Sequence, residues 1–184
     1  MGTYTLGTLT TVPVFDRPDL VAAPVLAALE RLGLTGEVGV VEIDAALSDT
    51  AATEEAYSLV GDDLANCVVV AGKREGEERV AACLVLSSTR ADVNTVVRKR
   101  LDVRKTSFLP MDRAVEESGM EYGGITPIGL PDDWPVLIDA RVLERPVVVI
   151  GSGVRRSKLL VPPSVLAALP TAEVIEGLAR PVEG

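Results

Sequence analysis

The sequence has no histidine, two cysteines and six aromatic residues among its 184 positions. Without histidine, the chain lacks the imidazole base of Ser-His-Asp and Cys-His hydrolases. Two thiols with no imidazole are also too few for a common zinc site. We therefore expect no metal and no cofactor. Any chemistry must use carboxylates, lysines, hydroxyls, backbone groups or the substrate itself.

The sequence also lacks an apolar stretch long enough to cross a membrane, and its N-terminus lacks the layout of a secretion signal. Cys67 and Cys83 both lie in apolar runs, where a cysteine is usually a reduced thiol packed as a small hydrophobic group. These features predict a cytoplasmic protein that does not contact membranes.

Positive charge is scarce, because the formal net charge is -9. Such a chain does not bind nucleic acid through its whole surface, so we expect no DNA partner, and phosphate binding would need a local basic patch. The densest basic cluster consists of Arg98, Lys99, Arg100, Arg104 and Lys105. This basic cluster is either a solvated helix face or a contact surface for an RNA backbone.

Aliphatic residues, by contrast, are abundant, since 47% of the chain is hydrophobic. Val, Leu, Ile and Ala must build the core, and valine-rich runs favour strands. The patterns predict strands over residues 38–43, 66–72, 79–87, 105–109, 135–139, 146–150 and 158–161. They predict helices over 19–34, 53–61, 92–101, 112–118 and 163–169, and either a strand or a helix over 172–178. Asp92 is the expected N-cap of the helix over 92–101.

The predicted strands outnumber the substantial helices and are often joined by turns. The short link between residues 66–72 and 79–87 predicts an antiparallel hairpin. We therefore expect an α/β protein of the α+β kind, with a mixed, largely antiparallel sheet and helices packed around it. Residues 1–35 form an N-terminal arm and helix, and residues 36–184 form the main region of one compact domain.

A glycine-proline run, residues 119–129, is the first segment that bears on chemistry. Gly123 and Gly124 permit positive φ angles and close backbone approach, while Pro127 fixes its own φ and restrains Thr126. Such a loop either holds backbone N–H groups toward a ligand or simply connects a helix to the next strand.

A second glycine segment follows the valine-rich strand and runs from Gly151 through Ser152 and Gly153 to Lys158. With Arg155 inside it, this segment is either an anion-binding turn or a hairpin turn with solvated charges. It lacks the Gly-Lys-Ser/Thr ending of a phosphate loop, and a strand, not a long helix, follows it.

One carboxylate differs from the others in its setting. Asp139 ends an apolar strand, and a lone carboxylate there usually has a partner or a task. The adjacent pairs Glu116–Glu117 and Asp132–Asp133 look like surface positions, because neighbours in sequence do not face one another.

Taken together, several segments resemble the YbaK/prolyl-tRNA synthetase-associated domain family of aminoacyl-tRNA deacylases. They are the strand from Asn66 to Gly72, the loop from Gly123 to Gly129, the strand ending at Asp139, the run 147–155 and the segment 159–163. The resemblance covers roughly residues 36–180 and leaves the N-terminal helix as an addition.

The resemblance implies a trans-acting enzyme that hydrolyses the ester between an amino acid and the 3′ end of a mischarged tRNA. An aminoacyl-tRNA synthetase is a further implied partner. The family's Gly-x-x-x-Pro element falls on Gly123 and Pro127, with Gly124 and Thr126 between them. The resemblance further implies substrate contacts. Their positions are Thr50, Thr126, Asp139, Gly151, Ser152, Gly153 and Arg155.

The chain departs from the family pattern at one position. Asn66 stands where the family usually has a lysine, and an amide supplies no positive charge. Arg155 and Lys73 are possible substitutes. Three functions therefore remain open: an editing hydrolase, a catalytically impaired module that binds aminoacyl-tRNA or a small ligand, and an unrelated small-molecule hydrolase that uses the same pocket.

Overall fold

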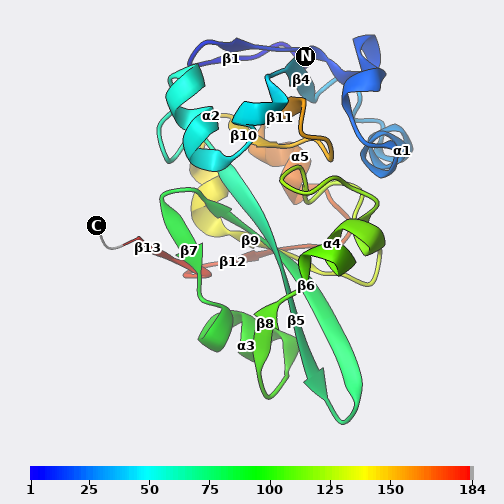
Figure 1. Ribbon diagram of the computed structural model, residues 1–184, viewed down its shortest axis with the longest axis vertical. Coiled ribbons are helices and arrows are strands. Elements are labelled where there is room, and N and C mark those ends of the chain that lie inside the picture. Colours follow the sequence, from blue (N-terminus) through cyan, green and yellow to red (C-terminus); the bar gives the residue numbers. More distant parts are fainter. Residues whose placement is uncertain (183–184) are drawn as a thin grey trace.

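The computed structural model describes residues 1–182 and has two main sheets (Figure 1). The larger sheet has the strand order β12-β9-β6-β5-β8. Its strands are β12 (Ala172–Ile175), β9 (Val136–Asp139), β6 (Glu77–Leu86), β5 (Ala65–Arg74) and β8 (Thr106–Phe108). The pairs β12–β9 and β9–β6 are parallel, and β6–β5 and β5–β8 are antiparallel.

The smaller sheet is antiparallel, with the order β10-β11-β4-β3. Its strands are β10 (Val148–Gly151), β11 (Ser157–Val161), β4 (Gly39–Glu42) and β3 (Val12–Pro13). The two sheets meet through a parallel bridge between Leu64, just before β5, and Val149 of β10. This junction brings the start of β5 next to the β10–β11 hairpin.

Two minor strand pairs complete the sheets. They are β1 (Thr5–Leu6) with β2 (Leu9–Thr10), and β13 (Ala179–Pro181) with β7 (Thr89–Ala91). The sequence pattern suggested a weakly specified arm over residues 1–17. The structure differs, because β3 pairs with β4 at the edge of the smaller sheet. Strands of two or three residues are too short to show alternation, and the sequence patterns missed β1, β2, β3, β7 and β13.

The α-helices are α1 (Ala23–Leu32), α2 (Thr50–Tyr57), α3 (Arg98–Leu101), α4 (Met111–Ser118) and α5 (Pro163–Ala167). A five-residue π-helix over 93–97 precedes α3, and 3-10 turns cover 14–16, 18–20, 45–47 and 140–144. The Asp92 carboxylate caps the helix before α3 by accepting the Thr95 N–H at 3.0 Å. Gly33 and Gly119 end α1 and α4 with φ angles of 70° and 69°, since glycine adopts that conformation freely.

The main core lies between the two sheets and α1. It includes Val25 and Leu29 of α1, Leu84 of β6 and Leu159 of β11. The α/β prediction with a mixed, largely antiparallel sheet is confirmed, as are the β5–β6 hairpin and the Asp92 cap. Residues 183–184 of the predicted main region lie outside the described residues.

In Figure 1 the β5–β6 hairpin runs along the long axis of the molecule. The smaller sheet, α1 and α2 lie near its upper end, and α3 and β8 lie near its lower tip. Across residues 1–182, no helix has the length and apolar character needed to span a membrane.

Candidate functional site

A hollow of about 440 Å³ lies at the junction of the two sheets. Its wall is formed by the start of β5, the facing ends of β10 and β11, the segment before α2, the start of α4 and the glycine-proline run. Its lining residues include Ser48, Thr50, Asn66, Gly123, Gly151 and Lys158. Four of the predicted site residues thus line one hollow: Thr50, Asn66, Gly123 and Gly151.

Lys158 ends the second glycine segment, but the sequence patterns did not predict it as a site residue. It lies on β11, between β10 and β4, and only 6% of the residue is exposed. Its Nζ donates a hydrogen bond to the Ser48 carbonyl at 2.9 Å. Burial, followed by the nearby Arg155 charge, lowers the pKa of Lys158 from 10.5 to about 8, and Asp49 partly opposes this shift. The hollow therefore has an ammonium group in its wall at neutral pH.

Gly151 lies directly opposite Lys158 in the β10–β11 ladder. A Cβ atom at Gly151 would approach the Gly124 and Ile125 carbonyl oxygens to 2.6 and 2.9 Å. The glycine-proline run therefore packs directly on the end of β10, beside the Lys158 side chain. Only a residue without a side chain permits this approach.

A polar pair forms another part of the wall. The Thr50 hydroxyl at the start of α2 donates to the Asn66 side-chain oxygen of β5 at 2.8 Å. This bond orients the Asn66 amide within the hollow. The Ser48 residue is 2% exposed, and its hydroxyl has no hydrogen-bond partner among the described residues.

Arg155 lies at the rim and connects two segments of the wall. Its guanidinium donates to the Tyr122 carbonyl at 3.2 Å and to the Ala45 carbonyl at 3.4 Å, and lies 5.7 Å from the centre of the Tyr122 ring. It also pairs with Asp49 at 3.7 Å. These contacts hold the segment before α2 against the glycine-proline run.

Asp139 lies outside this set of lining residues. It is 1% exposed, and its carboxylate accepts hydrogen bonds from Arg141 Nε at 2.8 Å and from the Ala179 N–H at 2.8 Å. Burial opposes ionisation, but the bonds from Arg141 and the backbone outweigh it and lower the pKa of Asp139. The carboxylate is therefore used to join β9 to the segment around β13.

The two serine and glycine positions after Gly151 are also used for packing. Ser152 Oγ lies 2.7 Å from Ser157 Oγ, and its carbonyl accepts the Ala22 N–H at 3.0 Å. A Cβ atom at Gly153 would approach Ala22 Cβ to 2.4 Å. These residues fasten the β10–β11 turn to the segment before α1 and are not among the lining residues.

Three other residues of the predicted Gly-x-x-x-Pro element, Gly124, Thr126 and Pro127, contact the protein away from the main hollow. The Gly124 carbonyl accepts the Gly153 N–H at 2.7 Å. Thr126 is fully buried, and its hydroxyl has no partner in the described chain. Pro127 borders a separate small hollow with Ala28 of α1. Of this element, Gly123 and Ile125 line the main hollow.

The thiol in the wall does not act as a thiolate. Cys67 lines the hollow, and burial raises its pKa far above neutrality. Burial also raises the pKa of Cys83, to about 12. Both thiols are free and protonated, so the hollow has no sulfur nucleophile at physiological pH.

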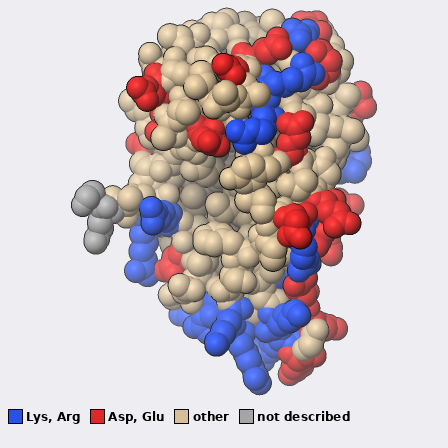
Figure 2. Space-filling model, viewed as in Figure 1, with Lys and Arg blue, Asp and Glu red and all other residues tan. Residues whose placement is uncertain are grey.

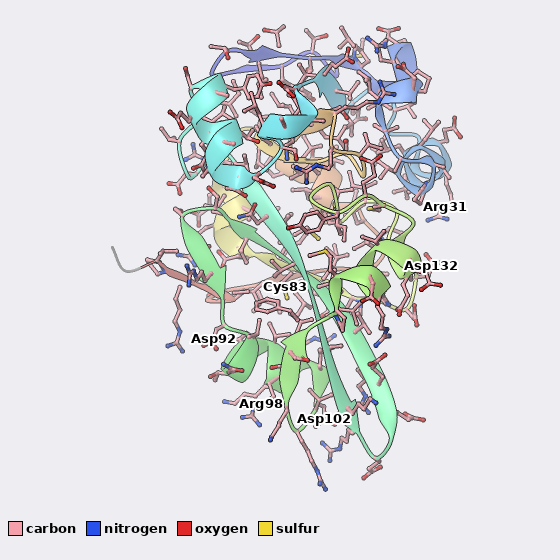
Figure 3. All side chains as sticks on the ribbon, viewed as in Figure 1. Arg31, Cys83, Asp92, Arg98, Asp102 and Asp132 are labelled. Atoms are coloured by element: carbon pink, nitrogen blue, oxygen red, sulfur yellow. The ribbon has the colours of Figure 1, made fainter. Side chains whose placement is uncertain are left out.

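The basic cluster lies at the other end of the molecule. Figure 2 shows Lys and Arg side chains gathered at the lower end of one face, and Figure 3 places Arg98 there with Asp102 on the adjacent backbone. Between this end and the hollow, the exposed side chains of Phe108 and Met111 lie on β8 and α4. Met111 also lines the hollow.

A second, larger hollow of about 590 Å³ lies beside the lower part of β6. All of its charged lining residues except Asp133 already belong to ion pairs. Arg79 contacts Asp102 at 3.4 Å, and Arg113 contacts Glu78 at 2.7 Å. The hollow at the sheet junction differs, because its buried Lys158 forms no ion pair with a carboxylate among the described residues. This hollow is therefore the candidate site.

Several solved structures share this fold. A proposed trans-editing enzyme for prolyl-tRNA synthetase superposes with a TM-score of 0.71 at 24% identity, over 88% of this chain and 96% of that chain. A scaffold protein for a computationally grafted epitope gives 0.71 at 24% identity, over 89% and 97%. A protein described as hypothetical gives 0.73 at 18% identity, over 85% and 99%.

No curated protein matches the sequence. The model of the aminoacyl-tRNA editing domain family matches residues 45–169, more than half of the chain. This range contains Thr50, Asn66, Gly123, Gly151 and Lys158, all of which line the hollow. The chain therefore belongs to the aminoacyl-tRNA editing domain family.

Proposed function

We propose that this protein hydrolyses the ester between an amino acid and the 3′ end of a tRNA that carries the wrong amino acid. The observation that carries the proposal is the hollow lined by Asn66, Gly123 and Lys158 in a chain of the aminoacyl-tRNA editing family. A volume of about 440 Å³ lies within the usual range of small-molecule sites. It suits the aminoacyl end of a tRNA and not its helical stem.

The reaction makes modest demands on side chains. A water molecule adds to the ester carbonyl, the carbonyl oxygen becomes negative, and the bond to the ribose oxygen then breaks. The ribose oxygen takes a proton that originates from the water, which leaves a free amino acid and a tRNA with both terminal hydroxyls. An aminoacyl ester is already activated, so positioning and stabilisation of the oxyanion can supply most of the rate enhancement.

The tRNA body needs a contact surface beyond the hollow, and the basic cluster supplies one. In a chain of net charge -9, these five basic residues gather at one end of the molecule. Lys99, Arg100, Arg104 and Lys105 are exposed. The exposed Phe108 and Met111 continue the surface toward the hollow. Basic side chains contact phosphates, and an aromatic ring stacks on an unpaired base.

A deacylation assay tests the function directly. The purified protein is incubated with a panel of mischarged tRNAs, and release of labelled amino acid is compared with spontaneous hydrolysis. Turnover of at least one member of the panel is expected. Tight binding without turnover would instead favour the non-catalytic module, and the hydrolase proposal would be withdrawn.

The glycine at the end of β10 offers a matched test of the site. Gly151→Ala pushes a Cβ atom against the Gly124 and Ile125 carbonyls, whereas Gly36→Ala meets only the Phe15 ring at 3.7 Å. Displacing the loop by about 1 Å is expected to lower kcat/KM about 100-fold for Gly151→Ala. Gly36→Ala is expected to keep the wild-type value. Equal kcat/KM in the two folded variants, checked by circular dichroism, would place the reaction elsewhere.

A further inference from the structure

Lys158 occupies an unusual place for a lysine. Its strand is covered on both faces: Leu159 and Val161 point into the main core, and Leu160 points into the second cluster on the opposite face. Lys158 lies on the Leu160 side, at the end of the strand where the sheet opens into the hollow. The side chain is thus buried in protein and directed at an internal surface, where ordinary solvation is lost.

The ammonium group has bonding capacity that the protein leaves unused. An ammonium carries three donors, and the structure gives Lys158 one hydrogen bond, to the Ser48 carbonyl. The neighbouring Asp49 carboxylate pairs with Arg155 at 3.7 Å. Beside this group, the buried Ser48 hydroxyl also has no partner in the part of the chain that is described. Two kinds of buried donor therefore belong to neighbouring residues in the wall of the hollow.

We infer that the Lys158 ammonium and the Ser48 hydroxyl bind the carbonyl oxygen of the aminoacyl ester and stabilise the negative charge that forms on it. This inference rests on the proposed hydrolysis. Buried donors that are already in position stabilise an oxyanion strongly, because no solvent has to reorganise during the reaction. A cation that is poorly solvated before the substrate binds gains more from such an oxygen than a surface lysine would.

Lys158 also supplies the charge that Asn66 lacks. Asn66 and Lys158 line the same hollow, Asn66 from β5 and Lys158 from β11. The two other candidates are placed differently. Lys73 lies opposite Glu78 in the β5–β6 ladder, near the tip of the hairpin. The Arg155 guanidinium already donates to the Tyr122 and Ala45 carbonyls and pairs with Asp49. The positive charge of the hollow therefore comes from Lys158 on β11 and not from the β5 position that Asn66 occupies.

If the Lys158 ammonium binds the substrate oxygen, substrate binding depends on its protonation state and therefore on pH. With its pKa lowered to about 8, Lys158 is mostly charged at pH 7 and mostly neutral at pH 9. The ionisable groups around it are Arg155 of the β10–β11 turn, Asp49 before α2 and the protonated Cys67 of β5. Tyr122 of the glycine-proline run also lines the hollow, so the contribution of the ammonium is measured as the difference between the wild type and variants at position 158.

The experiment compares Lys158→Met with Lys73→Met, an exposed lysine of the hairpin, in the full chain. Deacylation is measured with the mischarged tRNA that the wild type cleaves, and binding is measured with 3′-alanylamino-3′-deoxyadenosine, whose amide is not hydrolysed. Lys158→Met is expected to lower kcat about 100- to 1000-fold and to weaken analogue binding about 10-fold. Lys73→Met is expected to change neither.

A pH series separates this role from a structural one. Wild-type analogue affinity is expected to fall further between pH 7 and 9 than that of Lys158→Met or of the permanently charged Lys158→Arg, because the amino group of the analogue titrates alike in all three measurements. If the wild type cleaves tRNA and folded Lys158→Met has wild-type kcat and affinity, the inference is overturned while the function stands. If the wild type cleaves no tRNA but Lys158→Met weakens analogue binding, the proposed hydrolysis is refuted. The contact between Lys158 and the aminoacyl carbonyl oxygen is then still supported.

Discussion

Lys158 and Asp139 are both buried charged residues in the sheets, yet their surroundings differ. Asp139 is 1% exposed and accepts bonds from the Arg141 side chain and backbone and from the Ala179 N–H. Lys158 is 6% exposed and donates one bond, to a carbonyl, among the described residues. Burial of a charge therefore does not mark a functional site. A buried charge with unused bonding capacity beside a hollow does.

The two pKa shifts express the same difference in energy. The pKa of Asp139 is lowered because its bonds outweigh the cost of burial, so its charged form is favoured in the folded protein. The pKa of Lys158 is lowered because burial and Arg155 oppose its charged form. The Asp139 charge therefore stabilises the fold, whereas the Lys158 charge destabilises it. Functional sites commonly carry such a cost, since their groups are arranged for a ligand.

The largest expected effect is on stability at alkaline pH. Unfolded Lys158 keeps its proton up to its ordinary pKa of 10.5, and folded Lys158 releases it near its pKa of about 8. Between these values the unfolded chain binds more protons, so the free energy of unfolding of the wild type rises with pH. Lys158→Met lacks this term. Urea unfolding at pH 7 to 10.5 is expected to show the difference between them changing by up to roughly 3 kcal/mol.

Other groups that titrate over this range are common to both proteins and cancel in the difference. At pH 7 Lys158→Met is expected to be the more stable protein, because methionine replaces a poorly solvated charge. Lys73→Met serves as the reference, since an exposed lysine gives no such dependence. Parallel curves for wild type and Lys158→Met would mean that Lys158 is solvated, and the contrast with Asp139 would disappear.

The next effect is the loss of the satisfied carboxylate. Asp139→Asn removes the charge that Arg141 pairs with and is expected to lower the free energy of unfolding by about 1–3 kcal/mol at pH 7. Because the folded pKa of Asp139 is lowered, the wild type loses this stabilisation as the pH falls through the acidic range, and the two proteins converge there. Chemical unfolding at pH 7 and pH 3 measures both values.

Asp139→Asn also tests what the carboxylate does. Activity per folded molecule is expected to stay at the wild-type level, because the carboxylate is not among the groups that line the hollow. The exposed Asp133→Asn is the control for a simple loss of negative charge. A fall in kcat in fully folded Asp139→Asn, with Asp133→Asn unchanged, would return Asp139 to the substrate site.

The contrast also explains what the sequence could predict. The core strands, the β5–β6 hairpin and the Asp92 cap follow from local alternation, turns and capping, and these are the parts of the fold that were predicted correctly. The sequence signal at Asp139 was also sound, because a carboxylate that ends an apolar strand does have a partner. Arg141 is only two positions away, but the Ala179 N–H comes from a distant segment, and no local pattern contains that contact.

Lys158 shows the opposite case. At the start of a strand after a turn that contains two arginines, a lysine resembles an ordinary solvated charge. One signal was available: residues 157–161 are apolar or small at both alternating sets of positions apart from Lys158, which is typical of a strand covered on both faces. The hollow itself depends on the packing of the glycine-proline run against Gly151, and sequence spacing does not give that distance.

The smallest expected effect on stability concerns two hydroxyls close in sequence. Thr53 is fully buried, and its hydroxyl donates to the Leu47 carbonyl at 2.7 Å, whereas the buried Ser48 hydroxyl has no partner within residues 1–182. Thr53→Val removes a satisfied bond and is expected to cost about 1 kcal/mol. Ser48→Ala removes an unsatisfied donor and is expected to change the free energy of unfolding by less than about 0.5 kcal/mol.

Activity is expected to rank these two variants in the reverse order. Ser48→Ala removes one donor to the ester oxygen and is expected to lower kcat about 10-fold, while Thr53→Val keeps the wild-type kcat once its folded fraction is corrected. Thermal unfolding and deacylation on the same preparations measure both. If Ser48→Ala is as destabilising as Thr53→Val, its hydroxyl is already bonded inside the protein. The Lys158 ammonium would then be the one donor left in the proposed contact with the ester oxygen. Any fall in kcat of Ser48→Ala would have to come from a change in the position of that ammonium.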